Sequence, residues 1–429
     1  MPDERAACEV RLWDEPVGVV LELENGHILF EFYDSFRRRG IEISPLHLPT
    51  SLTGPVSFEE LRDKPAFNGL PGAFADSLPD SFGNSVIRAY FSARGETELA
   101  FSPVQRLLYV GERGIGALTY HPAIDMPLRP AEEESLEIAT LVRDARRIVE
   151  GKTDVTIPEI YRIGSSAGGM RPKAVVLYNP GTGEIRSGNA DPMSDDLPCI
   201  LKFDGVGDGA TADNLGVPLP YNRVEAAYAH VARAAGLDVS RIDLLEHDGY
   251  AHLLVHRFDV SEGERLHQHT FGGLIHVSYQ ERGASSYEEY LRCVLRLGMG
   301  HDALREAYRR MVFNVMAVNQ DDHVKNLSFQ MRRDGTWSLA PAYDVTFAKG
   351  RNWTSQHQMR VQDRTEGIRE TDLLRVAELF DIKKPEGILR SVREALARWE
   401  AVAQRYSVPA PTIAAIRSAL DERTRSMGG

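Results

Sequence analysis

Residues 319–326 read Asn-Gln-Asp-Asp-His-Val-Lys-Asn, and an Ala-Tyr-Asp-Val segment that contains Asp344 follows them. Phosphoryl transfer needs a carboxylate that orients the attacking hydroxyl and takes its proton, and oxygen ligands that hold magnesium on the phosphates. Asp321 and Asn326 have the five-residue offset of the Asp and Asn in a protein-kinase catalytic loop. Asp344, expected at the end of the next strand, offers the hard carboxylate oxygen that magnesium prefers. The pattern therefore predicts a phosphoryl-transfer site in this part of the chain.

The same residue types are also ordinary turn residues after a helix, because Asp and Asn side chains bond to nearby backbone groups. Such a helix is expected over residues 302–318, where apolar residues recur on one face. The presence of Asp344 beyond a hairpin turn at Asp334-Gly335 favours the catalytic interpretation over a turn without chemistry.

Lys202 is a candidate for a lysine that binds the phosphates. It lies within the apolar, strand-like residues 199–203. A lysine at such a place must find an anionic partner or extend its ammonium group to water, and both interpretations stay open. A helix is expected from Asn222, as its N-cap, to Ala235, with Gly236 as its C-cap. Glu225 in its first turn could pair with Lys202 or serve only as a capping residue.

A second phosphate-binding candidate is the small-residue loop Gly-Ser-Ser-Ala-Gly-Gly at residues 164–169, which Arg171 and Lys173 follow. Glycines let backbone N–H groups approach a phosphate, and the two cations add charge. The loop does not have the P-loop spacing, and a flexible surface loop is the competing interpretation.

The composition describes an ordinary globular chain of 429 residues, of which 42% are hydrophobic and 26% charged. No apolar run approaches the length of a membrane helix, and the first residues lack the apolar core of a secretion signal, so we expect a cytoplasmic protein without a membrane partner. Three scattered cysteines fit neither a disulfide framework nor a zinc site. The net charge of −12 disfavours direct binding to DNA and suits a basic protein partner.

The order of the expected elements indicates an α+β protein. Two strand-like runs at residues 19–24 and 27–33 flank an Asn-Gly turn, and Ser102-Pro103 marks the start of a short helix that ends at Gly111. A proline-rich stretch near residues 122–131 ends this part, and a helix is expected over residues 132–150. Further strands are expected at residues 116–120, 173–178, 199–203 and 251–258, and helices over most of residues 366–427.

These segments, together with Gly-Leu-Pro-Gly-Ala-Phe-Ala-Asp at residues 69–76 and Tyr-Val-Gly-Glu-Arg-Gly at residues 109–114, make the chain resemble the HipA family of toxin–antitoxin kinases along nearly its whole length. The resemblance implies a protein-kinase-like, HipA-like α+β fold with a β-rich N-terminal subdomain and a mainly helical C-terminal lobe. We expect the subdomain at residues 1–125, an ATP-binding N-lobe portion at 126–260 and the helical lobe with the catalytic loop at 261–429. ATP and Mg²⁺ would lie between the last two.

The resemblance also implies roles for single residues. Asp321 would be the catalytic base, and Asn326 and Asp344 would hold Mg²⁺. Lys202 would contact the ATP phosphates, and main-chain groups of His256 and Phe258 would read adenine, although the family often has an acidic residue at position 256. The remaining nucleotide contacts implied are Ser166, Gly168, Gly169, Lys173, His323 and Lys325.

In the family, a serine of the phosphate loop is phosphorylated by another copy of the kinase, and this expels the loop and turns the enzyme off. Ser166 is the better match by its spacing to Lys173, and the adjacent Ser165 is the alternative. A phosphoserine adds about −1.5 to −2 charge at neutral pH, which ATP phosphates and nearby carboxylates would repel.

The resemblance thus implies a growth-inhibiting serine/threonine kinase that phosphorylates a protein hydroxyl, as family members do on aminoacyl-tRNA synthetases. It would bind a HipB-like antitoxin and contact DNA only through it. One alternative is a catalytically silent corepressor that only binds the antitoxin, and another is a small-molecule kinase on the same fold. A complete set of Asp321, Asn326, Asp344 and Lys202 favours an active enzyme.

Overall fold

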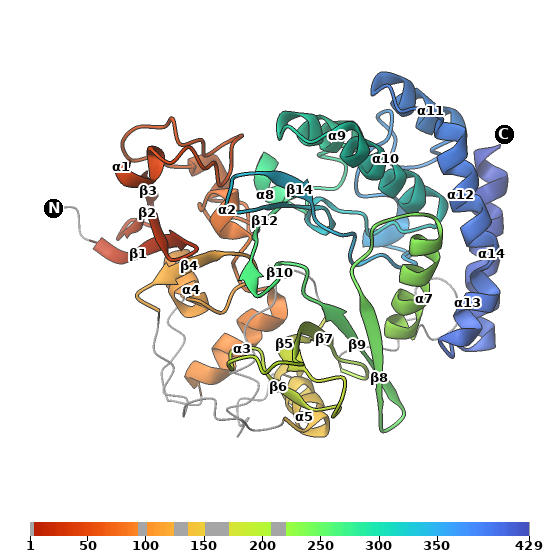
Figure 1. Cartoon of the computed structure of the whole chain (residues 1–429), viewed down its shortest axis with the longest axis horizontal. Coiled ribbons are helices and arrows are strands. Elements are labelled where there is room, and N and C mark those ends of the chain that lie inside the picture. Colours follow the sequence, from red (N-terminus) through yellow and green to blue (C-terminus); the bar gives the residue numbers. More distant parts are fainter. Residues whose placement is uncertain (1–3, 93–100, 124–135, 151–170, 207–219, 429) are drawn as a thin grey trace. The chain divides into compact units, whose positions relative to one another are not determined.

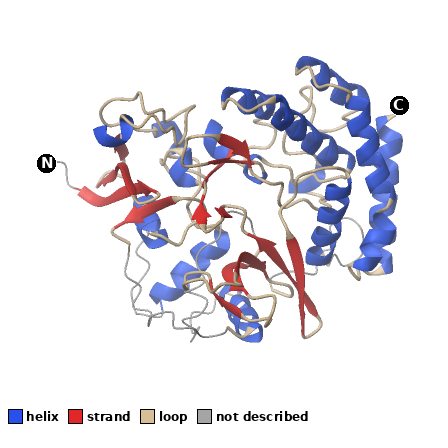
Figure 2. Cartoon of the chain, in the orientation of Figure 1, coloured by secondary structure: helices blue, strands red, loops and turns tan. Residues whose placement is uncertain are grey.

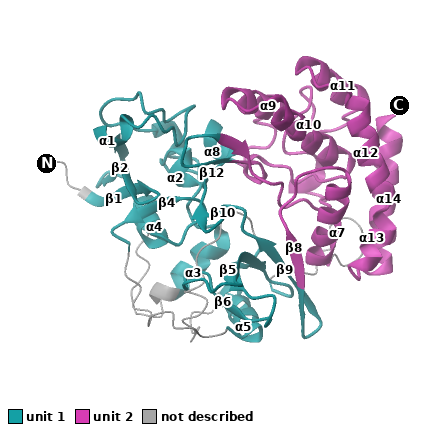
Figure 3. Cartoon of the chain, viewed as in Figure 1, with its two compact units in different colours: residues 1–207, 245–278, 330–336 teal, residues 208–244, 279–329, 337–429 magenta. Residues whose placement is uncertain are grey.

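The computed structural model describes residues 4–92, 101–123, 136–150, 171–206 and 220–428. The chain forms two compact units. Unit 1 comprises residues 1–207, 245–278 and 330–336, and unit 2 comprises residues 208–244, 279–329 and 337–429 (Figure 3). Most strands belong to unit 1, whereas unit 2 is mainly helical (Figure 2). Across the described ranges, every helix is too short or too polar to span a membrane.

A four-stranded antiparallel sheet opens unit 1, in the order β3-β2-β1-β4 (Figure 1). Gly26, with φ of 80°, makes the expected turn between β2 and β3. Ser102 caps α4 through a reciprocal capping box with Gln105, and Gly111 ends that helix, as predicted. The elements are β1 (Glu4–Leu12), β2 (Glu15–Leu23), β3 (Ile28–Phe32), α1 (Asp34–Arg37), η1 (Glu59–Leu61), α2 (Gly72–Ala75), α3 (Ser81–Ser92), α4 (Pro103–Val110) and β4 (Leu118–His121).

A second sheet has five strands in the order β6-β5-β7-β9-β8, and its strands belong to unit 1 except for residues 242–244 of β8, which belong to unit 2. Apolar side chains of β5 and β7 pack with α3 and α5 into one core, in which Leu141, Val176 and Leu201 are fully buried. This core fixes the strands whose ends carry the candidate nucleotide residues. The elements are α5 (Ile138–Val149), β5 (Lys173–Tyr178), β6 (Ile185–Ser187), β7 (Leu197–Lys202), β8 (Ile242–His247), β9 (Tyr250–His256), β10 (Val260–Ser261), β11 (Glu264–Arg265), β12 (His267–Thr270) and α8 (Phe271–Ile275).

A buried polar group, here called the Asp76 cluster, joins α2 to β12 and consists of Ser44, Asp76, His269 and Thr270. His269 lies between Asp76 Oδ2 (2.7 Å from Nδ1) and Ser44 Oγ (2.9 Å from Nε2). Thr270 donates its backbone N–H and its hydroxyl to the same carboxylate, each at 2.7 Å. The cluster gives the 69–76 motif a structural role in unit 1, which sequence reasoning did not supply.

Unit 2 is built around α10, whose residues Tyr308, Met311, Val312 and Val315 are fully buried, as the periodicity predicts. The β13–β14 turn contains Gly335 with φ of 83°, which confirms the predicted hairpin. The elements are α7 (Tyr221–Ala234), α9 (Tyr287–Arg296), α10 (His301–Met316), η2 (Val324–Asn326), β13 (Ser328–Met331, which continues into unit 1), β14 (Trp337–Leu339), η3 (Trp353–Ser355), α11 (Glu370–Leu379), α12 (Pro385–Ala397), α13 (Trp399–Arg405) and α14 (Ala410–Met427).

Three local predictions are wrong. The helix predicted with Asn222 as its N-cap begins two residues earlier, with Pro220 as N-cap, and Asn222 is buried inside its first turn. The helix expected over residues 132–150 begins at Ile138, because the N–H of Leu136 bonds instead to the carbonyl of Ile185 in β6 (2.7 Å). Asp344 does not end a strand, since β14 stops at Leu339.

Candidate phosphoryl-transfer site

The 319–326 loop leaves the end of α10 through Val318, whose φ of 56° lies in the left-handed region. The N–H of Asn319 bonds to the carbonyl of Asn314 (3.0 Å), and the N–H of Gln320 bonds to the carbonyl of Ala348 (2.9 Å). Backbone groups of unit 2 therefore hold both ends of the loop's first turn. This fixes the backbone from which the side chains of Asp321 and Asp322 extend.

Asp321 is half-buried in this loop, and two of its neighbours bond to it. The indole Nε1 of Trp353 donates to Oδ1 at 2.8 Å, and the Asn326 amide donates to the Asp321 backbone carbonyl at 2.8 Å. Burial raises the pKa of the Asp321 carboxyl, and the charges of Asp344 and Asp322 add to the rise, while His323 and the Trp353 hydrogen bond oppose it. A carboxylate whose proton affinity is raised in this way suits general-base work.

Asn326 and Asp344 carry the oxygens that would hold a cation. The Asn326 amide nitrogen is engaged by Asp321, so the orientation of its amide plane is set. Asp344 has φ of 50°, a conformation that costs a non-glycine residue about 1 kcal/mol or more and is commonly retained at functional sites. Tyr343 ties this bend to the loop, because its hydroxyl contacts the Lys325 carbonyl (2.6 Å) and the Ser328 hydroxyl (2.6 Å).

The donor set fits magnesium, because Mg²⁺ takes one or two protein oxygens and completes its octahedron with phosphates and water. Within the ranges that the structure describes, no three His, Cys, Asp or Glu side chains gather into a metal-binding group. Asn326 and Asp344 remain the predicted protein ligands for such an ion.

Asp322, the neighbour of the candidate base, has a different environment. It is 2% exposed and accepts hydrogen bonds from the Tyr287 hydroxyl (2.9 Å), His357 Nδ1 (2.9 Å) and the Gln358 N–H (2.7 Å). Asn314 in turn donates to the Tyr287 hydroxyl (2.9 Å). Asp322 thus holds the loop against its surroundings rather than facing a substrate.

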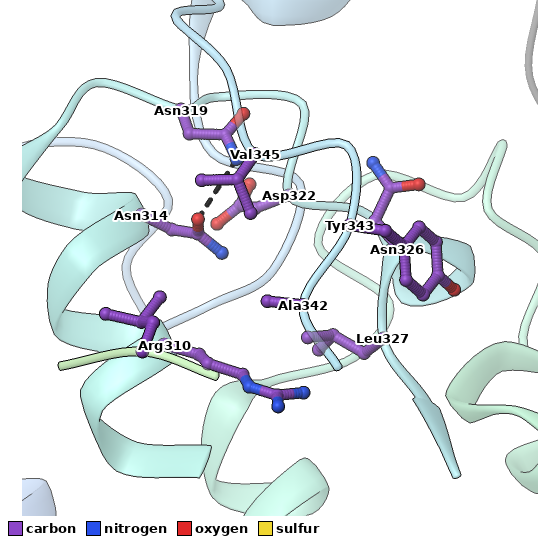
Figure 4. A pocket seen from close by; sticks show the side chains of 10 residues that line it. Arg310, Asn314, Asn319, Asp322, Asn326, Leu327, Ala342, Tyr343 and Val345 are labelled. Carbon is purple, nitrogen blue, oxygen red and sulfur yellow. Dashed lines mark hydrogen bonds between the residues drawn. The ribbon is translucent and has the colours of Figure 1, made fainter. Parts of the chain in front are cut away.

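Behind the loop lies a small pocket within unit 2, into which Asp322, Asn314 and Asn319 project (Figure 4). The Asn319 amide donates to Asn314 at 3.0 Å, the bond that is dashed in the figure. The pocket is lined by Leu237, Arg310, Asn314, Asn319, Asp322, Asn326, Leu327, Ala342, Tyr343 and Val345.

His323 and Lys325 flank the Tyr279 ring. The His323 and Tyr279 ring centroids lie 5.5 Å apart, and the Lys325 ammonium lies 5.4 Å from the Tyr279 centroid. Burial lowers the pKa of His323, which favours the neutral ring, while the charges of Asp321 and Asp344 oppose this shift. Its Nδ1 is buried and bonds to no group in the described part of the chain, which leaves a polar atom for a ligand beside Asp321.

In unit 1, Lys173 and Lys202 are direct partners across the antiparallel β5–β7 ladder. Partners in such a ladder share one face of the sheet, and both lysines are largely buried, at 6% and 8% exposure. Asp80, the acceptor for the Gly83 N–H in the first turn of α3, lies 3.6 Å from the Lys173 ammonium.

The candidate adenine contacts lie where β9 ends. His256 is the last residue of β9, and the N–H of Arg257 bonds to the Pro198 carbonyl of β7 (2.8 Å). The Gln330 amide donates to the Phe258 carbonyl at 2.9 Å, which anchors this segment. Ser165, Ser166, Gly168 and Gly169 lie outside the described residues.

His267 and His269 lie two residues apart on β12, a spacing that two metal ligands on one face of a strand could have. The contacts confirm packing, because His267 Nε2 bonds to the Ile43 carbonyl at 2.8 Å and His269 belongs to the Asp76 cluster. Trp353, His357 and Gln358 were missed, since no motif marks an indole or an amide that reaches the catalytic loop from a distant segment.

Two protein-family models match this chain. A model of the HipA-like C-terminal domain matches residues 165–405, and a model of the HipA N-terminal domain matches residues 8–121. The chain belongs to the HipA family. Its fold is that of the HipA chain in a Shewanella oneidensis structure titled as a toxin–antitoxin system of HipA, HipB and operator DNA, with a TM-score of 0.67, 16% identity, and coverage of 97% of this chain and 96% of that one.

Two curated proteins are similar to this HipA-family chain in sequence. A Sinorhizobium fredii protein described as "Putative kinase Y4dM" is 23% identical over 96% of this chain and 95% of its own length. A Haemophilus influenzae protein, described as "Putative kinase", is 28% identical over 44% of this chain and 54% of its own length.

Proposed function

We propose that this HipA-family chain is an ATP-dependent, Mg²⁺-requiring serine/threonine protein kinase of a toxin–antitoxin module. The observation that supports this most directly is the Asp321 carboxylate, held by Trp353, tied through Asn326 to the same loop and electrostatically coupled to Asp344. The family match and the kinase descriptions of the similar proteins support the same reaction class.

Each residue has a stated task in the proposed reaction. Asp321 orients the acceptor hydroxyl and takes its proton as the oxygen attacks the γ-phosphorus, and ADP leaves with the electron pair of the broken P–O bond. Asn326 and Asp344 would hold the metal ion, which when bound neutralises charge on the phosphates. Lys202 and Lys173 would bind the phosphates, and main-chain groups of residues 256–258 would bind adenine.

A serine of the 164–169 loop, Ser166 or Ser165, is proposed as the acceptor for a self-inhibiting phosphate. The partner proposed is a basic, HipB-like antitoxin, in keeping with the complex named for the Shewanella structure and with the net charge of −12. The acceptor outside the chain is proposed to be a protein, with aminoacyl-tRNA synthetases as the first class to test.

The test is to incubate the purified full-length chain with ATP and Mg²⁺ and to record intact mass and phosphopeptides beside an Asp321→Asn control. A phosphate on the Ser165–Ser166 peptide, absent from the control, is the expected result. A wild type that neither binds ATP nor gains phosphate would overturn the proposal in favour of a silent antitoxin-binding protein. Activity on sugars or antibiotics with no protein acceptor would assign a small-molecule kinase.

A further inference from the structure

The segment after Asp344 returns to the catalytic loop and is held there by one amide. Gln358 Nε2 lies within bonding distance of three carbonyls: Trp353 (2.7 Å), Gln356 (2.9 Å) and Gln320 (3.1 Å). The Gln358 N–H also bonds to Asp322. Residues 353–358 and the catalytic loop are therefore fixed to each other within unit 2 at both the backbone and the side chain.

The Trp353 indole reaches from this segment to Asp321. Its Nε1 lies 2.8 Å from Oδ1, and its ring face lies 5.6 Å from the Arg282 guanidinium, which also donates to the Asn352 carbonyl at 2.8 Å. An indole N–H is a donor only, so Trp353 can hold a carboxylate but can never take a proton. Among the described residues it is the donor to the Asp321 carboxylate, and the second oxygen has none.

We propose that Trp353 is a positioning residue that fixes one oxygen of Asp321 and thereby directs the other to the acceptor hydroxyl. The inference rests on the proposed kinase function. A carboxylate on a flexible side chain turns freely about two bonds, and a base displaced by about 1 Å can lose up to about 10²-fold in rate. Since ATP is bound elsewhere in the proposal, loss of the indole donor should lower kcat and leave the KM for ATP unchanged.

The contact itself can be tested without nucleotide, by ¹H–¹⁵N spectra of the full chain. The protein has four tryptophans, so four indole signals are expected, and Trp353→Phe identifies one by its loss. Asp321→Ala should shift that signal and leave the Trp399 signal in place, because the Trp399 indole bonds to the Ile413 carbonyl instead. If Asp321→Ala left the Trp353 signal unmoved, the contact would be absent in solution and the inference overturned.

The rate is tested by autophosphorylation with ATP and Mg²⁺. Trp353→Phe keeps an aromatic face for Arg282 and removes only the donor, so kcat should fall about tenfold with an unchanged KM for ATP. The matched control, Trp399→Phe, makes the same chemical change away from the loop and should keep wild-type kcat. If Trp353→Phe unfolds, changing each of the other three tryptophans to Phe assigns the Trp353 indole signal by elimination. The spectrum of Asp321→Ala then tests the contact.

The possible failures are distinguishable. If the wild type is active and Trp353→Phe has the same kcat, only the positioning role of Trp353 is overturned. A wild type that transfers no phosphate, like its Asp321→Asn variant, overturns the proposed function and this inference with it.

Discussion

The Asp76 cluster of unit 1 and the Asp321 site of unit 2 are both built on an aspartate, and they differ in how many donors that aspartate receives. Asp76 accepts bonds from His269 and from both donors of Thr270. Asp321 accepts one bond to its carboxylate from the described part of the chain, from Trp353. The first carboxylate is saturated by the protein, and the second keeps capacity for a proton from outside.

Geometry alone would mislead here. Ser44, His269 and Asp76 have the hydrogen-bond order and distances of a Ser–His–Asp hydrolase triad. Both Ser44 and His269 are 0% exposed, however, so no substrate reaches the hydroxyl. Both carboxylates are half-buried, so they differ in the hydrogen bonds that they accept: the Asp76 carboxylate has both oxygens engaged and marks a structural polar group, whereas, among the described residues, the Asp321 carboxylate has one oxygen left over and marks a reactive one.

Asp321→Asn should have the largest effect of the changes suggested by this comparison, and the effect is on the rate of phosphoryl transfer. The amide keeps the shape and can still accept the Trp353 bond, but it cannot take a proton. Phosphoryl transfer should fall about 10³-fold, within the range for losing a general base. Autophosphorylation rates measure this decrease. In thermal unfolding the Asp321→Asn variant should be as stable as the wild type. A variant with full activity would show that another group is the base.

Gly72→Ala should have the largest effect on stability. A Cβ at Gly72 would lie 1.9 Å from the Gly273 carbonyl oxygen, and backbone there cannot move aside without displacing α8 from α2. We expect a loss of about 3 kcal/mol in the free energy of unfolding, measured by urea titration. The control is Gly387→Ala in α12, where a Cβ meets no atom within 4 Å, and helix propensity predicts a gain of about 0.5–1 kcal/mol.

Asp76→Asn tests how much the hydrogen bonds accepted by the Asp76 carboxylate contribute to stability. The amide oxygen can take the place of Oδ2, which accepts from His269 and the Thr270 N–H, only if the NH₂ group takes the place of Oδ1, to which the Thr270 hydroxyl donates, so that hydroxyl loses its acceptor. The expected loss is about 2 kcal/mol of unfolding free energy. Asp63→Asn, at an exposed position, is the control and should leave stability unchanged. Equal stability of both variants would show that the Asp76 bonds contribute little.

The sequence predicted those features that local patterns encode. The Asn-Gly and Asp-Gly turns and the start of α4 at Ser102-Pro103 each depend on residues a few positions apart. The hydrogen-bond partners of Asp321 and Asp322 are distant in sequence. Trp353 lies 32 residues from Asp321, and Tyr287 lies 35 residues from Asp322. Such contacts form only after α9, α10 and the segment after Asp344 have packed, and no spacing rule predicts them.

The failures at Asn222 and Asp344 have the same origin. Asn222 has a side chain that commonly caps helices, yet tertiary packing buries it in the first turn of α7. Asp344 follows a strand-like pattern, yet its bend is imposed by Tyr343, whose hydroxyl bonds to Lys325 and Ser328. In both cases a contact from outside the local segment overrides its preference.

The effect that is smallest at neutral pH concerns a histidine beside the Asp76 cluster. His276 Nε2 accepts the Gly72 N–H at 3.1 Å, which requires a neutral ring. Burial, together with the charges of His47 and His269, lowers the pKa of His276 to about 3, although Asp76 opposes them. Below about pH 6.5 the unfolded chain binds a proton here that the folded chain refuses, so stability falls as the pH falls toward 3.

His276→Gln removes this titration and keeps an oxygen that can accept the Gly72 N–H. Between pH 4 and 6 the slope of unfolding free energy against pH should therefore become smaller by about 1.4 kcal/mol per pH unit. Urea midpoints at several pH values measure that slope, and His301→Gln at an exposed position should leave it unchanged. An unchanged slope in His276→Gln would mean that the ring accepts its proton in the folded state, and that the contact with Gly72 does not depend on a neutral imidazole.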